Sequence, residues 1–132
     1  MEDKKKLNVL VVDDEPHIVN LVKLSLDGDD YKVQGAYSAR EAKTTMEQFV
    51  PDIMILDIMM PGVNGYDLCK ELKEKEKTSN IPIVILSAKT QIQDKLQAVE
   101  VGADDYITKP FDPIELKRRI DHNAFQTIKG GA

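Results

Sequence analysis

The chain has 132 residues, of which 42% are hydrophobic and 31% are charged. This length suits one domain, and the composition is typical of a globular protein and excludes a disordered one. The net charge of −5 argues against nucleic acid as a direct partner, since phosphate binding needs a concentrated basic face.

The cysteine content and the apolar segments indicate where in the cell the protein is located. A single cysteine, Cys69, excludes an internal disulfide and fits a reducing environment. The apolar run at residues 9–12 is far too short for an export signal or a membrane span. We therefore expect a cytoplasmic protein without membrane attachment, with Cys69 half-buried on a helix.

The first elements are expected to be two strands with a helix between them. Residues 9–12 are apolar throughout, which predicts a strand buried on both faces of a parallel sheet. A helix should follow from Pro16 to about Leu26, where the acidic turn 27–30 ends it. Residues 31–34 alternate in polarity and predict an edge strand.

The middle of the chain predicts two helices on either side of a central strand. The first of them begins with the capping pair Ser38 and Glu41. Its apolar stripe consists of Ala39, Ala42, Met46 and Phe49. The apolar run 53–56 predicts the strand, and a shorter stripe of Leu68 and Leu72 predicts the second helix.

The last third repeats this alternation. The apolar run 83–86 predicts another central strand, and a helical stripe follows at Ile92, Leu96 and Val99. The short run 106–108 predicts a second edge strand. Asp112 as N-cap and Pro113 as the first helical residue begin the last helix. Its stripe is Leu116, Ile120 and Ala124.

Alternating strands and helices predict an α/β fold with helices on both faces of a five-stranded parallel sheet. Central apolar strands, with the alternating run 31–34 and the short run 106–108 at the edges, favour a doubly wound sheet of order 2-1-3-4-5. The topological switch point, where such sheets bind ligands, then lies between the first and third strands. We assign residues 1–122 to this domain and residues 123–132 to a C-terminal tail or linker.

Reactive side chains follow the predicted strands. Asp13 and Asp14 follow the first strand, Asp57 the third, Ser87 the fourth and Lys109 the fifth. Parallel strands end at one edge, so these groups should converge there. Crowded carboxylates repel unless a cation neutralises them, and Mg²⁺ prefers oxygen ligands. The sequence therefore predicts a magnesium site.

Each of these residues also has a structural alternative. Asp13 and Asp14 could cap the helix that begins at Pro16, Asp57 could belong to a plain turn, and Lys109 could be a surface lysine. Their combination at three strand ends weighs against this. The Lys109–Pro110 bond is a candidate cis peptide.

Four segments carry a resemblance to a known family. They are VVDDE at 11–15, ILDIMMPG at 55–62, LSA at 86–88 and GADDYITKPF at 102–111. Each alone is weak, but together and in this order they are specific. From about Leu7 to Asp121 the chain resembles the receiver domain of two-component response regulators, whose topology is flavodoxin-like.

The resemblance implies a phosphorelay. Asp57 would accept a phosphoryl group from the phosphohistidine of a sensor histidine kinase. Asp14 would bind Mg²⁺ directly, Asp13 largely through water, and the backbone carbonyl of Met59 would be a further ligand. The domain would catalyse only its own phosphorylation and slow dephosphorylation.

The resemblance also implies a switch. The Ser87 hydroxyl would bond a phosphoryl oxygen, and Lys109 would pair with the acceptor and then with the phosphoryl group. Tyr106 would be the aromatic residue that turns inward when Ser87 moves. Met59 and Lys89, two residues beyond Asp57 and Ser87, should tune hydrolysis.

These movements would remodel the face of the fourth helix, fifth strand and fifth helix. Its charged residues are Lys95, Glu100, Asp104, Asp105, Glu115 and Arg119. Receivers of winged-helix regulators are similar in this pattern and dimerise through this face when phosphorylated. An ordinary solvated surface is an equal alternative.

Three other functions fit less well. A phosphohydrolase of the aspartyl-phosphate kind normally has a second aspartate where this chain has Met59. A flavin binder would open its first strand into a hydroxyl-rich loop, whereas Asp13 and Asp14 repel phosphate. A phosphorylation-independent adaptor would lack one of the acid, hydroxyl or lysine groups. His17 and His122 are expected to be exposed and to play no part as phosphate relays.

Overall fold

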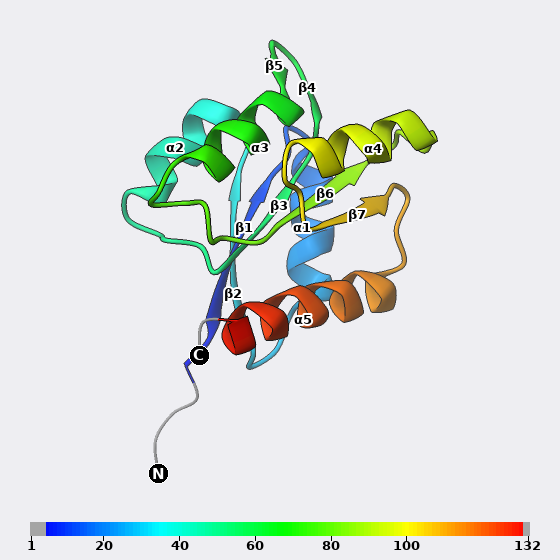
Figure 1. Ribbon diagram of the computed structural model, residues 1–132. Coiled ribbons are helices and arrows are strands. Elements are labelled where there is room, and N and C mark those ends of the chain that lie inside the picture. Colours follow the sequence, from blue (N-terminus) through cyan, green and yellow to red (C-terminus); the bar gives the residue numbers. More distant parts are fainter. Residues whose placement is uncertain (1–4, 131–132) are drawn as a thin grey trace.

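The computed structural model describes residues 5–130, with side chains described through residue 124 (Figure 1). Its main sheet has five parallel strands: β1 (Leu7–Val12), β2 (Tyr31–Ala36), β3 (Ile53–Leu56), β6 (Ile83–Ser87) and β7 (Asp105–Thr108). Their order is β2-β1-β3-β6-β7, which confirms the predicted order 2-1-3-4-5. The two strands expected at the edges, β2 and β7, lie there.

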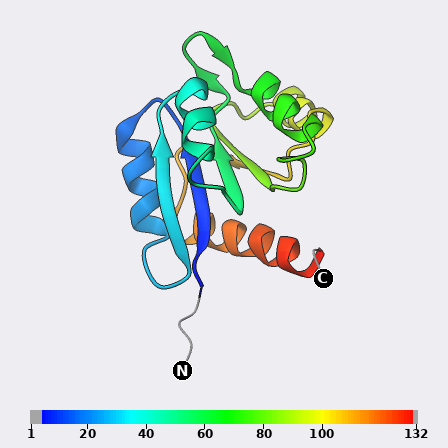
Figure 2. The ribbon, with the colours of Figure 1, turned by 90° about the vertical axis from the view of Figure 1, so that its left-hand side faces the viewer.

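Five helices cover the two faces of this sheet (Figures 1 and 2). They are α1 (Pro16–Ser25), α2 (Ala39–Met46), α3 (Gly65–Glu74), α4 (Ile92–Glu100) and α5 (Pro113–Gly130). The helix starts predicted at Ser38 and Asp112 are confirmed, because the Ser38 hydroxyl accepts the Glu41 amide at 3.0 Å and the Asp112 carboxylate accepts the Ile114 amide at 3.0 Å.

Alternate side chains of each central strand supply two separate cores. In β1, Val9 and Val11 pack with α1 and α5, whereas Leu10 and Val12 pack with α2, α3 and α4. This follows from the two-residue period of a strand, which sends successive side chains to opposite faces. Because both faces are covered, the central strands are apolar throughout.

A two-stranded hairpin after β3 was not predicted. Strands β4 (Met59–Met60) and β5 (Val63–Asn64) pair antiparallel and project beyond the main sheet (Figure 1). Pro61 and Gly62 form the turn, and Gly62 has a φ of +72°, which suits the third position of a type II turn. Strands of two residues show no periodicity in a sequence, so the sequence gives no signal for this hairpin.

Helix α4 is confirmed, but its apolar stripe does not face the core. The exposed fractions of Ile92, Leu96 and Val99 are 74%, 56% and 71%, and α4 packs on the sheet through Ala98 instead. Periodicity alone gives the width of an apolar stripe and not what covers it.

The buried thiol of Cys69 is a second correction. Its side chain is fully buried between α3 and the sheet rather than half-buried. Burial raises the pKa of the Cys69 thiol to about 11. The charge of Lys73 opposes this increase, and the charge of Asp104 adds to it.

Helix α5 continues through the segment that we expected to be a tail or linker. Asn123 and Ala124 are buried, and the helix ends at Gly130. Residues 131 and 132 of that segment lie outside the described part of the chain, as do residues 1–4. Division of the chain at residue 122 stays a prediction.

Among the helices of residues 5–130, none combines the length and apolar character needed to cross a membrane.

Two isoleucines on different helices allow a matched test of the core. We expect Ile120→Ala to lower the free energy of unfolding by about 2–5 kcal/mol, because Ile120 is fully buried and its loss leaves a cavity. Ile92→Ala should change it by less than about 0.5 kcal/mol, since Ile92 faces solvent. Urea denaturation measures both, and equal losses would contradict this packing.

Candidate functional site

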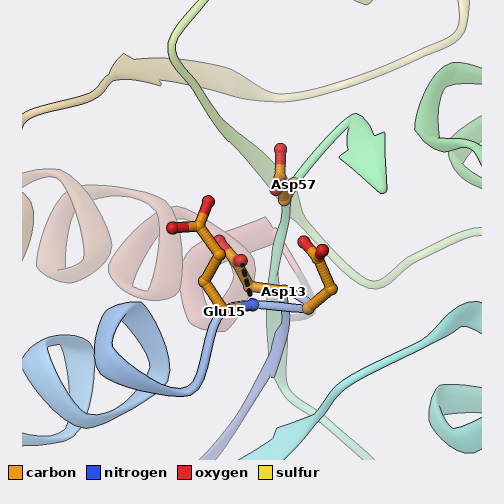
Figure 3. A group of neighbouring side chains, drawn as sticks. Asp13, Glu15 and Asp57 are labelled. Atoms are coloured by element: carbon orange, nitrogen blue, oxygen red, sulfur yellow. Dashed lines mark hydrogen bonds between the residues drawn. The ribbon is translucent and has the colours of Figure 1, made fainter. Parts of the chain in front are cut away.

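Carboxylates from the ends of β1 and β3 meet at one edge of the sheet (Figure 3). Asp13 and Asp57 are 1% and 3% exposed, and Asp14 and Glu15 lie next to them. One oxygen from each of these four side chains lies within 4.8 Å of the others. The predicted convergence of Asp13, Asp14 and Asp57 is therefore present.

The structure does not show the capping alternative for these acids. Glu15 occupies the N-cap position of α1, and its side chain makes no capping hydrogen bond. The Asp13 carboxylate instead accepts the Glu15 amide at 2.9 Å, the dashed line in Figure 3. This bond fixes one Asp13 oxygen and leaves the other facing the site.

Lys109 brings a cation to the same edge from the end of β7. Its ammonium nitrogen lies 2.8 Å from Asp13 Oδ2, 3.3 Å from Asp57 Oδ2 and 3.8 Å from Glu15 Oε1. Burial works to lower the pKa of Lys109, but hydrogen bonds to the two aspartates and their negative charges outweigh it and raise that pKa. Lys109 therefore stays charged. Its peptide bond to Pro110 is cis, as predicted.

Asp57 is held at both of its carboxylate oxygens. Oδ1 accepts the Met59 amide at 2.9 Å, and Oδ2 faces the Lys109 ammonium. Burial raises the pKa of Asp57, and the charge of Asp13 adds to the increase, although the Met59 amide and Lys109 oppose it. The carboxylate is thus oriented but incompletely compensated.

The donor set fits a hard divalent cation. All four groups of the cluster offer carboxylate oxygens, which Mg²⁺ and similar ions prefer, and one ammonium cannot neutralise them all. Asp13, Asp14 and Asp57 could hold such an ion. Met59 lies on β4 beside Asp57, and the role of its carbonyl as a ligand stays a prediction.

Ser87 and Tyr106 lie on the neighbouring strands. Ser87 is fully buried at the end of β6, and its hydroxyl accepts the Lys89 amide at 3.1 Å. Tyr106 is partly buried against the core, and its hydroxyl donates to the Lys89 carbonyl at 2.9 Å. Both side chains therefore contact the loop that leads to α4.

Sequence reasoning missed Gly65, which the site requires. A Cβ atom at this position would lie 2.3 Å from Ile58 Cα and 2.8 Å from the Asp57 carbonyl oxygen. Only glycine therefore lets α3 begin directly against the backbone of Asp57. The Asn64–Gly65 pair was the signal in the sequence, since such pairs mark tight turns.

The charged face of α4, β7 and α5 is only partly available to a partner. Arg119 is paired with Asp105 at 2.6 Å and Glu115 at 3.0 Å, so these charges satisfy one another. Asp104 turns away and pairs with Lys73 at 2.8 Å. Lys95 and Glu100 are exposed, and so are His17 and His122.

Comparisons with known proteins give a consistent picture. The family model described as the response regulator receiver domain matches residues 9–121. The DNA-binding dual master transcriptional regulator RpaA of Synechocystis sp. is 42% identical over 112 residues, which are 85% of this chain and 46% of RpaA. Response regulator SaeR of Staphylococcus aureus is 45% identical over 115 residues, 87% of this chain and 49% of SaeR.

Solved structures agree with this match. The Vibrio cholerae chemotaxis protein CheY4 superimposes with a TM-score of 0.84 at 28% identity, covering 90% of this chain and 99% of that one. The chain thus spans about half the length of the curated relatives above and nearly all of this structural neighbour.

The raised pKa of Asp57 predicts how stability depends on pH. The pKa of Asp57 in the folded chain is above its ordinary value of 3.8. The folded chain therefore loses stability as the pH rises from 3.8 to the folded-state pKa. Without divalent cations, Asp57→Asn should therefore have a higher free energy of unfolding than the unaltered chain at neutral pH. The difference should disappear below pH 3.8.

Urea denaturation in a chelating buffer at several pH values measures this difference. Asp29→Asn, in an exposed turn, is the matched control and should show no change. Equal or lower stability of Asp57→Asn at neutral pH would mean that the Asp57 charge is fully compensated.

Proposed function

Because this chain belongs to the family of response regulator receiver domains, we propose that it accepts a phosphoryl group on Asp57 from the phosphohistidine of a sensor histidine kinase. The observation that carries this proposal is the state of Asp57. It is buried, oriented by the Met59 amide and Lys109, and surrounded by other acids. The group that is phosphorylated belongs to the chain itself, so we propose a signalling domain and not an enzyme.

The transfer step follows from these contacts. An Asp57 carboxylate oxygen attacks phosphorus, the bond from phosphorus to the imidazole nitrogen breaks, and its electron pair leaves with the imidazole. A carboxylate is a weak nucleophile in water, so its fixed orientation supplies much of the effect. Lys109 stabilises the charge that spreads over the phosphoryl oxygens. Mg²⁺, held by Asp13, Asp14 and Asp57, would supply further charge neutralisation.

Hydrolysis of the acyl phosphate would reset the domain. The acidic edge opens onto a cavity of about 610 Å³ whose lining includes Asp14, Met59 and Lys89. The Met59 side chain is exposed there, so it stands where water would approach the phosphoryl group. We propose that Met59 and Lys89 set the rate of hydrolysis.

The switch would begin at Ser87. A phosphoryl group adds about −1.5 to −2 charges, which attract the Ser87 hydroxyl away from the Lys89 amide that it now accepts. Lys89 and Tyr106 are joined by a hydrogen bond, so the movement reaches β7 and α4. A nearly complete switch needs about 5.5 kcal/mol of preference for the active state.

The face of α4, β7 and α5 is the proposed output surface. Ile92, Leu96 and Val99 are exposed and lie in a row on α4. A contiguous apolar patch on a protein surface is typical of an interaction site. A second copy of this chain is the proposed partner after phosphorylation. With its net charge of −5, this chain is proposed to bind proteins and not nucleic acid, in the cytoplasm.

Intact mass after incubation with acetyl phosphate tests the phosphoryl transfer. With Mg²⁺ we expect a gain of about 80 Da, the mass of one phosphoryl group, and without Mg²⁺ little or none. Asp57→Asn should gain nothing, whereas Asp29→Asn should behave like the unaltered chain. An adduct on Asp57→Asn would show that another residue is the acceptor.

Light scattering after size-exclusion chromatography tests the output surface. The phosphorylated chain should elute as a dimer, and Leu96→Lys should remain a monomer because it places a charge in the apolar row. Leu24→Lys changes an exposed residue of α1; this variant is the control and should still dimerise. Dimers of Leu96→Lys together with monomers of Leu24→Lys would place the interface on α1.

A further inference from the structure

Tyr66 connects the acceptor site to α4. Its side chain is 4% exposed at the start of α3, and its amide donates to Asn64 Oδ1 at 2.9 Å. Its hydroxyl donates to the carbonyl of Asp94, in the first turn of α4, at 2.9 Å. Since the preceding residue, Gly65, lies against the backbone of Asp57 and Ile58, Tyr66 links that backbone to α4.

Tyr106 makes a corresponding hydrogen bond to Lys89, five positions before Asp94 in the chain. Its hydroxyl donates to the Lys89 carbonyl, so the two tyrosines hold the two ends of the segment 89–94 that leads into α4. Burial first, and then the nearby Tyr106 and Asp94, raise the pKa of Tyr66 to about 12. The Tyr66 hydroxyl therefore keeps its proton at neutral pH and remains a donor.

Other contacts hold α4 weakly. Along this helix, which lies wholly within the described residues, Ala98 is the one buried residue, and the row of Ile92, Leu96 and Val99 faces solvent. A helix that buries so little apolar area owes its position largely to its end contacts. The bond of the Tyr66 hydroxyl to the Asp94 carbonyl is such a contact.

We propose that Tyr66 is a positioning residue that holds the first turn of α4 in its unphosphorylated place and so opposes switching. This inference rests on the proposed function. Movement of Ser87 would release the Lys89 amide, and the segment 89–94 could then shift at one end while Tyr66 still holds the other. Removing the Tyr66 hydroxyl should make this shift easier. By linkage, a phosphoryl group or its mimic that favours the shifted state should then bind more tightly.

Beryllofluoride with Mg²⁺, a mimic of the phosphoryl group, is the probe. From the net value of one hydrogen bond, we expect Tyr66→Phe to bind it about three- to tenfold more tightly than the unaltered chain. Amide exchange in residues 95–98, measured by nuclear magnetic resonance without the probe, should quicken by a similar factor. Tyr37→Phe removes a hydroxyl from a partly exposed tyrosine and should change neither quantity.

The outcomes separate this inference from the proposed function. Equal or weaker beryllofluoride binding by Tyr66→Phe would overturn the inference, as would unchanged exchange in α4. Unchanged exchange in β3 of the same sample shows that the variant is folded. If the unaltered chain bound no beryllofluoride, the proposed function would fail, and the exchange rates alone would decide whether Tyr66 holds α4.

Discussion

Two buried carboxylates share one ammonium group, and the rest of the site depends on this imbalance. Asp13 and Asp57 are nearly inaccessible to water, where an unpaired charge is costly. Lys109 reaches both, but Asp14 and Glu15 add further negative charge beside them. An excess of negative charge therefore remains at this edge of the sheet, and it favours the binding of cations.

The positions at which the central strands end bring these charged and polar groups together. Each central strand ends one residue before its polar side chain or at it, so β1 presents Asp13, β3 presents Asp57 and β6 presents Ser87. Because the strands are parallel, these ends share one edge, and the cores formed on both faces hold them in register. The start of α3 at Gly65 then packs directly against the backbone of Asp57 and Ile58.

Much of this arrangement could be predicted from the sequence, and the failures have physical causes. Apolar runs determined the strands and their order, since burial on both faces leaves few other patterns. The direction of the α4 stripe could not be predicted, because periodicity does not report which face of a helix packs on the sheet, and α4 packs through Ala98. The hairpin of β4 and β5 is too short for periodicity. The contact of Tyr66 with Asp94 joins residues 28 positions apart, which no local pattern reports.

The sheet also divides the protein into two compartments that can vary independently. Side chains beneath α1 and α5 never meet those beneath α2, α3 and α4 within the described cores, and substitutions without shared neighbours combine additively. Sequence drift in one compartment therefore leaves the packing of the other intact. The core beneath α2, α3 and α4 can therefore keep its packing while substitutions accumulate in the core beneath α1 and α5.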